Sequence, residues 1–103
     1  MDVTVDNGDR QLSKELWSDV DRYITDLVVK PESALDEALA RAVKAGLPQI
    51  SVTPGEGKLL QLLARIRGVR NILEIGTLAG YSTIWMARAL PPGGRLVTLE
   101  SEP

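Results

Sequence analysis

Apolar residues recur at steps of three and four positions in the first third of the chain. These positions are Leu12, Leu16, Val20, Ile24, Leu27 and Val28. The period predicts an amphipathic helix over residues 12–29 that ends before Pro31. Residues 1–11 are polar and lack this period, so we expect them to form an arm outside the helix.

A second helix is predicted from the pattern that follows Pro31. Ser33 and Asp36 have the spacing of a capping box, and Gly46 and Pro48 are expected to stop the helix. Its apolar stripe consists of Leu35, Leu39, Ala42 and Val43. Together with the first helix it forms the predicted N-terminal helical segment, residues 1–48.

A third helix has the clearest start in the chain. Thr53 can cap it, Pro54 suits the first helical position, and Glu56 completes a capping box. Gly68 is expected to close it. Its wide apolar face is predicted to consist of Leu59, Leu60, Leu62, Leu63 and Ile66.

The segment after this helix reads as a strand, a glycine turn and a helix start. Ile72, Leu73 and Ile75 form a short apolar run that is typical of a parallel strand covered on both faces, although Glu74 interrupts it. Gly76 and Gly80 bracket a turn, and Ser82 and Thr83 supply hydroxyls that could cap a helix over residues 82–90. A second strand over residues 96–99 ends on Glu100. This order predicts a β-α-β unit with a ligand crevice at the carboxyl ends of its strands.

Two common phosphate motifs do not fit this turn. The dinucleotide fingerprint needs a glycine where the chain has Leu78. A P-loop around Lys58 would need a glycine at Val52 and a hydroxyl at Leu59. A nicotinamide-binding oxidoreductase is therefore the weaker alternative. An acid at Glu100, about twenty residues beyond the turn, is placed to accept hydrogen bonds from adenosine ribose hydroxyls.

At these residues the chain resembles a known enzyme family. The segments 73–82 (LEIGTLAGYS), 51–54 (SVTP) and 96–100 (LVTLE) occur in the order and spacing of S-adenosylmethionine-dependent O-methyltransferases of the caffeoyl-CoA and catechol type, bacterial members included. The resemblance is close over residues 45–103 and loose in the N-terminal helices. It implies a Rossmann-like class I methyltransferase fold of the α/β class. Residues 49–103 would then be the front half of the cofactor-binding domain.

The resemblance also implies which residues bind S-adenosylmethionine. They are Val52, Glu74, Gly76, Thr77, Ser82 and Glu100. Val52 would lie against the methionine part of the cofactor. Glu74 would favour its positively charged end, and Ser82 with the helix-start amides would bind its carboxylate. The family's divalent cation ligands lie beyond the second strand, so we assign no metal ligand and no catalytic residue, and a cation is expected only in a full-length form.

The amino-acid composition excludes several kinds of functional site. The chain has 103 residues, 44% of them hydrophobic and 25% charged, which is ordinary for one globular domain. It contains neither cysteine nor histidine, so disulfides, thiolate metal sites and a histidine base are excluded. No apolar run is long enough for a membrane span, and we expect a cytoplasmic protein without a membrane partner.

The partners are expected to be a small-molecule substrate and a second copy of the chain. Arg65, Arg67 and Arg70 could attract an anionic substrate or RNA, but a solvated helix end explains this cluster better. Because one edge of the first strand would be bare, we expect a homodimer. It would form through these edges or through the helices at 12–29.

The sequence therefore predicts the cofactor-binding half of an O-methyltransferase. A full-length form would methylate a hydroxyl of a small aromatic, CoA-linked or RNA substrate, and the 103-residue chain alone is expected to be inactive. It could be a fragment, a truncated gene product or an engineered piece. The alternative is a non-catalytic domain that serves protein association.

Overall fold

The computed structural model describes residues 7–102. The chain divides into two units, Met1–Lys30 and Pro31–Pro103, so the second predicted helix belongs to the same unit as the strands. Within the described residues, no helix combines the length and the apolar composition needed to cross a membrane.

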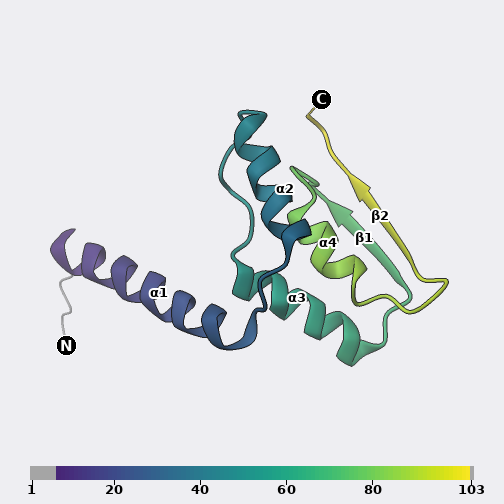
Figure 1. Ribbon diagram of the computed structural model, residues 1–103, viewed down its shortest axis with the longest axis horizontal. Helices are drawn as coiled ribbons and strands as arrows, with labels where there is room; N and C mark the ends of the chain where they lie inside the picture. The colour runs from purple at the N-terminus through teal and green to yellow at the C-terminus, as the bar shows by residue number, and fades with distance from the viewer. Residues whose placement is uncertain (1–6, 103) are drawn as a thin grey trace, which may run out of the picture. The chain divides into compact units, whose positions relative to one another are not determined.

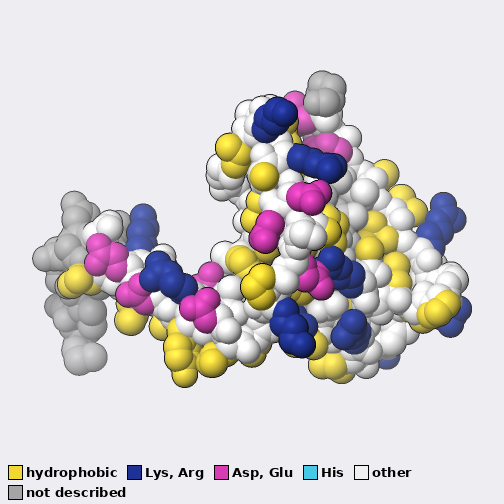
Figure 2. Space-filling view, viewed as in Figure 1, with side chains coloured by type: hydrophobic (Ala, Val, Ile, Leu, Met, Phe, Trp, Pro, Cys, Tyr) yellow, Lys and Arg dark blue, Asp and Glu magenta, His cyan; other side chains and the backbone are white. Residues whose placement is uncertain are grey.

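The first unit contains a single described helix, α1 (Asn7–Val28). The prediction of an arm is wrong for residues 7–11, which are helical; residues 1–6 lie outside the described part. No proline interrupts this stretch, and one glycine costs a helix only about 1 kcal/mol. Figure 2 shows charged side chains along one side of α1 and hydrophobic ones along another, and Leu16, Trp17 and Leu27 are exposed.

The second unit begins with α2 (Ser33–Lys44), whose start differs from the prediction. Its N-cap is Glu32, and no side chain caps it, so the capping box of Ser33 and Asp36 is wrong. The Glu32 carboxylate instead pairs with Arg88. Leu35, Ala38 and Ala42 are the buried residues of the helix; the wider stripe was wrong in including Val43, which is exposed.

The start of α3 (Pro54–Arg67) is confirmed. The Glu56 N–H donates to the Thr53 hydroxyl at 3.2 Å, and the Thr53 N–H donates to the Glu56 carboxylate at 2.8 Å. At the other end, Gly68 adopts φ 68°, the left-handed conformation that glycine accepts without strain. Both ends of α3 are thus determined by nearby residues.

The buried face of α3 differs from the predicted one. Gly57 and Gln61 are buried, whereas the apolar residues Leu59, Leu62, Leu63 and Ile66 are exposed. The reason lies in the neighbouring helix, because the indole of Trp85 packs directly on Gly57. A β-carbon at Gly57 would lie 2.3 Å from Trp85 Cδ1, closer than any real contact. Close approach at a glycine decides the orientation of α3.

The central helix of the second unit is α4 (Tyr81–Ala87), which packs against α2, α3 and β2 (Arg95–Leu99). Tyr81 and Trp85 are its buried residues. The helix begins one residue earlier than predicted and ends three residues earlier. Its N-cap is Gly80, without a side-chain hydrogen bond. The expectation that Ser82 and Thr83 cap it is wrong, because both hydroxyls donate to Glu74 instead.

The predicted strands pair in parallel as β1 (Asn71–Ile75) and β2, which confirms the β-α-β unit. Glu74 lies opposite Thr98 in the register. Figure 1 shows α2, α3 and α4 on the same side of the two strands. Glu74 is buried on this covered face, whereas Leu73 and Ile75 are exposed on the other, open face. Cover on both faces was therefore a wrong prediction for the described chain.

Candidate functional site

A cavity of about 600 Å³ lies at the carboxyl ends of β1 and β2. Its size is within the range of small-molecule sites, and its place is the one that ligands take in open parallel sheets. Three segments of the second unit surround it: the loop between α2 and α3, the turn from β1 into α4, and the residues after β2. The lining residues are Leu47, Pro48, Ile50, Ser51, Val52, Gly76, Thr77, Leu78, Tyr81, Ser82, Glu100 and Glu102.

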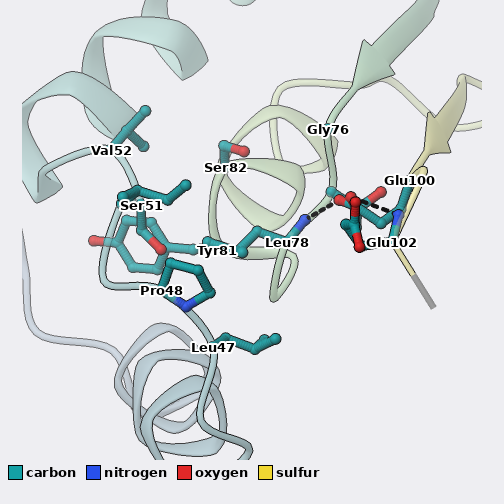
Figure 3. A pocket seen from close by; sticks show the side chains of 12 residues that line it. Leu47, Pro48, Ser51, Val52, Gly76, Leu78, Tyr81, Ser82, Glu100 and Glu102 are labelled. Carbon is teal, nitrogen blue, oxygen red and sulfur yellow. Dashed lines mark hydrogen bonds between the residues drawn. The ribbon is translucent and has the colours of Figure 1, made fainter.

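Most of the residues predicted to bind a cofactor are brought together here. Val52, Gly76, Thr77, Ser82 and Glu100 all line the cavity. In Figure 3, Val52 lies on one side and Glu100 on the other, with Ser82 between them in the view. Glu74 is not among the lining residues.

The turn between β1 and α4 is held in an unusual backbone conformation. Gly76 has φ 95° and Gly80 has φ 81°, which suit glycine, but Leu78 also has a positive φ of 50°. A left-handed conformation is uncommon for a residue with a β-carbon. The Gly76 N–H donates to the Leu99 carbonyl at 2.7 Å, and the Gly80 N–H donates to the Thr77 carbonyl at 2.9 Å. These bonds tie both ends of the turn.

The Leu78 N–H connects the turn to β2. It donates to the Glu100 carboxylate at 2.7 Å, a contact drawn in Figure 3. The Glu102 N–H donates to the same carboxylate at 3.3 Å. Hydrogen bonds to the charged form favour it, so the Leu78 N–H lowers the pKa of Glu100, and the Glu102 N–H adds to the effect. Glu100 therefore presents a negative charge at one end of the cavity.

Glu74 lies within a cluster of hydroxyl groups on the covered face. Its carboxylate accepts from Ser82 Oγ at 2.6 Å, from Thr98 Oγ1 at 2.8 Å and from Thr83 Oγ1. Glu74 as a whole residue is only 8% exposed, and in the described part of the chain it forms no ion pair. While Ser82 donates to Glu74, only its oxygen lone pairs remain for a ligand.

The charged residues around the cavity indicate which kind of ligand it can bind. Among the described residues that line it, Glu100 and Glu102 are acidic, and none is lysine or arginine. Phosphate-rich ligands are usually held by cationic side chains or by glycine-rich amide nests. This arrangement instead favours a neutral or positively charged ligand with hydroxyl donors. In residues 7–102, no three acidic side chains converge as a metal site.

Sequence reasoning missed several lining residues and one important neighbour. Pro48 was interpreted only as part of a helix stop, and Leu47 and Ile50 were assigned no role in the site, yet all three form an apolar part of the cavity wall. Thr98, interpreted only as a strand residue, donates to Glu74. Pairing the last residues of the two predicted strands, Ile75 and Leu99, would have placed Thr98 opposite Glu74.

Comparison with known proteins shows the family. The model of the O-methyltransferase family matches residues 26–103. A curated catechol O-methyltransferase of Niastella koreensis is 54% identical over 92 residues, which are 89% of this chain and 42% of that protein. The chain belongs to the S-adenosylmethionine-dependent O-methyltransferase family, and it spans about two fifths of the length of such relatives.

Solved structures agree with this assignment. An O-methyltransferase from Bacillus cereus in complex with SAH is 55% identical, with a TM-score of 0.83 over 85% of this chain and 40% of that chain. The O-methyltransferase of tomaymycin synthesis from Streptomyces achromogenes, in complex with SAM, is 55% identical, with a TM-score of 0.77 over 82% of this chain and 38% of that one. The second unit is thus part of a Rossmann-like methyltransferase fold.

Proposed function

We propose that this chain binds S-adenosylmethionine in the cavity at the ends of β1 and β2. It would supply the cofactor-binding part of an enzyme that methylates a hydroxyl group. The observation that supports this most strongly is the Glu100 carboxylate, which the Leu78 N–H holds at the end of β2 beside a cavity of about 600 Å³. The neighbours solved with SAM or SAH support the same ligand.

The residues present fit this cofactor. S-adenosylmethionine carries an ammonium and a sulfonium, and it supplies the activated methyl group when bound. Glu100 would accept hydrogen bonds from the ribose hydroxyls, and Val52 would contact the methionine portion. Gly76 leaves room beside the backbone, because a β-carbon there would meet nothing within 4 Å. The described lining residues include two acids and no lysine or arginine, which suits a ligand whose reactive end is cationic.

The acceptor is proposed more broadly. In a full-length form we expect it to be a hydroxyl of a small aromatic, CoA-linked or RNA substrate, with a divalent cation possible there. Methyl transfer needs an aligned and activated acceptor oxygen. None of the described residues is assigned that role, and we propose that the 103-residue chain alone transfers no methyl group.

Calorimetric titration of the chain with S-adenosylmethionine and S-adenosylhomocysteine tests the proposal. We expect saturable heat with both and none with NAD. Glu100→Gln should weaken binding roughly ten-fold, because a charged acceptor for the ribose is lost. Glu102→Gln is the matched control, since it removes the same charge from the same cavity and should have a smaller effect. Equal effects of the two variants would refute the role of Glu100.

A second candidate function is protein association without catalysis. It is favoured by the apolar side chains exposed on the open face of the sheet, Leu73, Ile75, Val97 and Leu99. This alternative predicts no heat with either cofactor form. The same titration therefore separates the two functions.

A further inference from the structure

A threonine outside the cavity connects the cavity wall to the buried carboxylate. Thr98 lies in β2 opposite Glu74 and is not one of the lining residues. Its Oγ1 lies 2.8 Å from Glu74 Oε1 and 2.5 Å from the Oγ1 of Thr77. Thr77 does line the cavity. Thr98 thus contacts both a core residue and a residue of the predicted cofactor site.

The number of protons fixes the direction of these bonds. A hydroxyl has one proton to donate, and a carboxylate can only accept. Because Thr98 donates to Glu74, the proton in its contact with Thr77 must come from Thr77. The chain of donors therefore runs from Thr77 to Thr98 to Glu74.

This order gives Thr98 a role that Thr83 lacks. Both threonines donate to Glu74, but in the bonds described here only Thr98 also accepts from the turn. Valine has nearly the same shape as threonine and suits a strand equally well, so neither packing nor strand propensity requires a hydroxyl at residue 98. The Thr98 hydroxyl is therefore important for its hydrogen bonds to Glu74 and Thr77.

We infer that Thr98 is a positioning residue that fixes Thr77 and the turn at residues 76–80 for cofactor binding. The link to cofactor binding rests on the proposed function, whereas the hydrogen bonds of Thr98 do not depend on it. Thr98 orients the Thr77 side chain through one hydrogen bond and thereby restrains the backbone that leads to Leu78. The Leu78 N–H in turn holds Glu100. The Thr98 hydroxyl thus supports the turn and, through it, the Leu78 contact to Glu100, although Thr98 does not line the cavity.

The test compares Thr98→Val with Thr83→Val by amide hydrogen exchange in the absence of ligand. Each variant removes one donor from Glu74, but only Thr98→Val removes the acceptor of Thr77. We expect exchange at the Leu78 amide to accelerate roughly five-fold in Thr98→Val, relative to the Ile72 and Val97 amides of the parallel ladder, as expected for one lost hydrogen bond. Thr98→Ser should restore the slow exchange, and Thr83→Val should not produce this local change.

Equal behaviour of Thr98→Val and Thr83→Val would overturn the inference, as would unchanged exchange in Thr98→Val. If Thr98→Val does not fold, Thr77→Val gives the same test from the other end, because it leaves the bond from Thr98 to Glu74 in place. Titration with S-adenosylhomocysteine is the second readout, with weaker binding expected in Thr98→Val than in Thr98→Ser. A wild-type chain that binds no cofactor would defeat the proposed function, while the exchange comparison would still decide the role of Thr98.

Discussion

The two faces of the short sheet differ in what they contact. On the covered face, Glu74 is buried and receives three hydroxyl hydrogen bonds, and α4 packs there with Trp85 only 4% exposed. On the open face, Leu73 is 65% exposed and Ile75 is 81% exposed. Both faces carry apolar residues, but only one is packed in this chain.

This difference shows which contacts position the residues of the site. The cavity, its turn and Glu100 depend on contacts within the second unit that are already complete: the parallel ladder, the hydroxyl cluster and the packing of α4. The open face adds no contact to them. We therefore expect cofactor binding and stability to be sensitive to the covered face and nearly insensitive to the open one.

The largest effect is expected from Trp85→Ala. Removing a buried indole between α3 and α4 should lower the free energy of unfolding by about 3 to 5 kcal/mol, which could unfold so small a domain. Urea denaturation followed by circular dichroism measures it. A loss below about 1 kcal/mol would show that the covered face is not the stabilising one.

A smaller loss is expected from Gly57→Ala. Its β-carbon would lie within 2.8 Å of three Trp85 ring atoms, so the indole or α3 must shift, at a cost of about 1 to 3 kcal/mol. Gly55→Ala, in the first turn of the same helix, is the control for the change in helix propensity. Equal stabilities of the two variants would contradict the close contact.

Substitutions on the sheet should separate the two faces directly. Ile72→Thr, on the covered face, should cost at least about 1 kcal/mol, and Leu73→Thr, one residue later, about 0.5 kcal/mol or less. Denaturation of both variants under identical conditions checks the difference. A larger loss at Leu73 would reverse the assignment of the faces.

In the described residues β1 pairs only with β2, and its exposed edge suggests self-association. We propose a homodimer that forms through the β1 edge or through the apolar stripe of α1. Light scattering at low micromolar concentration should give more than the 11.2 kDa of one chain. Leu73→Lys should dissociate a dimer formed through the sheet, and Leu16→Glu one formed through α1. A monomeric, cooperatively melting wild-type chain would contradict the proposal.

The smallest effect concerns pH. The pKa of Glu100 is lowered in the folded chain by the Leu78 N–H, so the unfolded chain takes up this proton first as the pH falls. The stabilisation is complete above the ordinary carboxyl pKa and is lost as the pH falls through the lowered one. Between pH 7 and pH 3, the urea midpoint of Glu100→Gln should therefore fall slightly less than that of wild type. Glu102→Gln is the control, and identical falls in Glu100→Gln and wild type would contradict the assignment.

Features set by neighbouring residues could be predicted from the sequence. The capping box of Thr53 and Glu56 and the close of α3 at Gly68 are of this kind. The pairing of the two strands followed from the general rule for β-α-β units. The position of the cavity followed from the strand order and from Gly76, since parallel strands end at one edge of a sheet. These features need no knowledge of distant contacts.

The rest depends on residues far apart in the chain. The buried face of α3 is decided by Trp85, which packs on Gly57, and the apolar pattern of α3 carries no sign of that contact. The hydroxyls of Ser82 and Thr83 are suited to capping, but the buried carboxylate of Glu74 competes for them. Thr98 lies 24 residues from Glu74. The local sequence pattern identifies these side chains as polar candidates, but it does not show which distant residue each one contacts.

The most direct test of the account is an NMR titration of the labelled chain with S-adenosylhomocysteine. If the cofactor binds in the cavity, the amides of Gly76, Thr77, Leu78 and Ser82 should shift in a saturable way, and the Val97 amide on the open face should stay nearly unchanged. Such a pattern would place the ligand in the cavity at the ends of β1 and β2. Absence of shifts at millimolar ligand, or shifts confined to the open face, would contradict it.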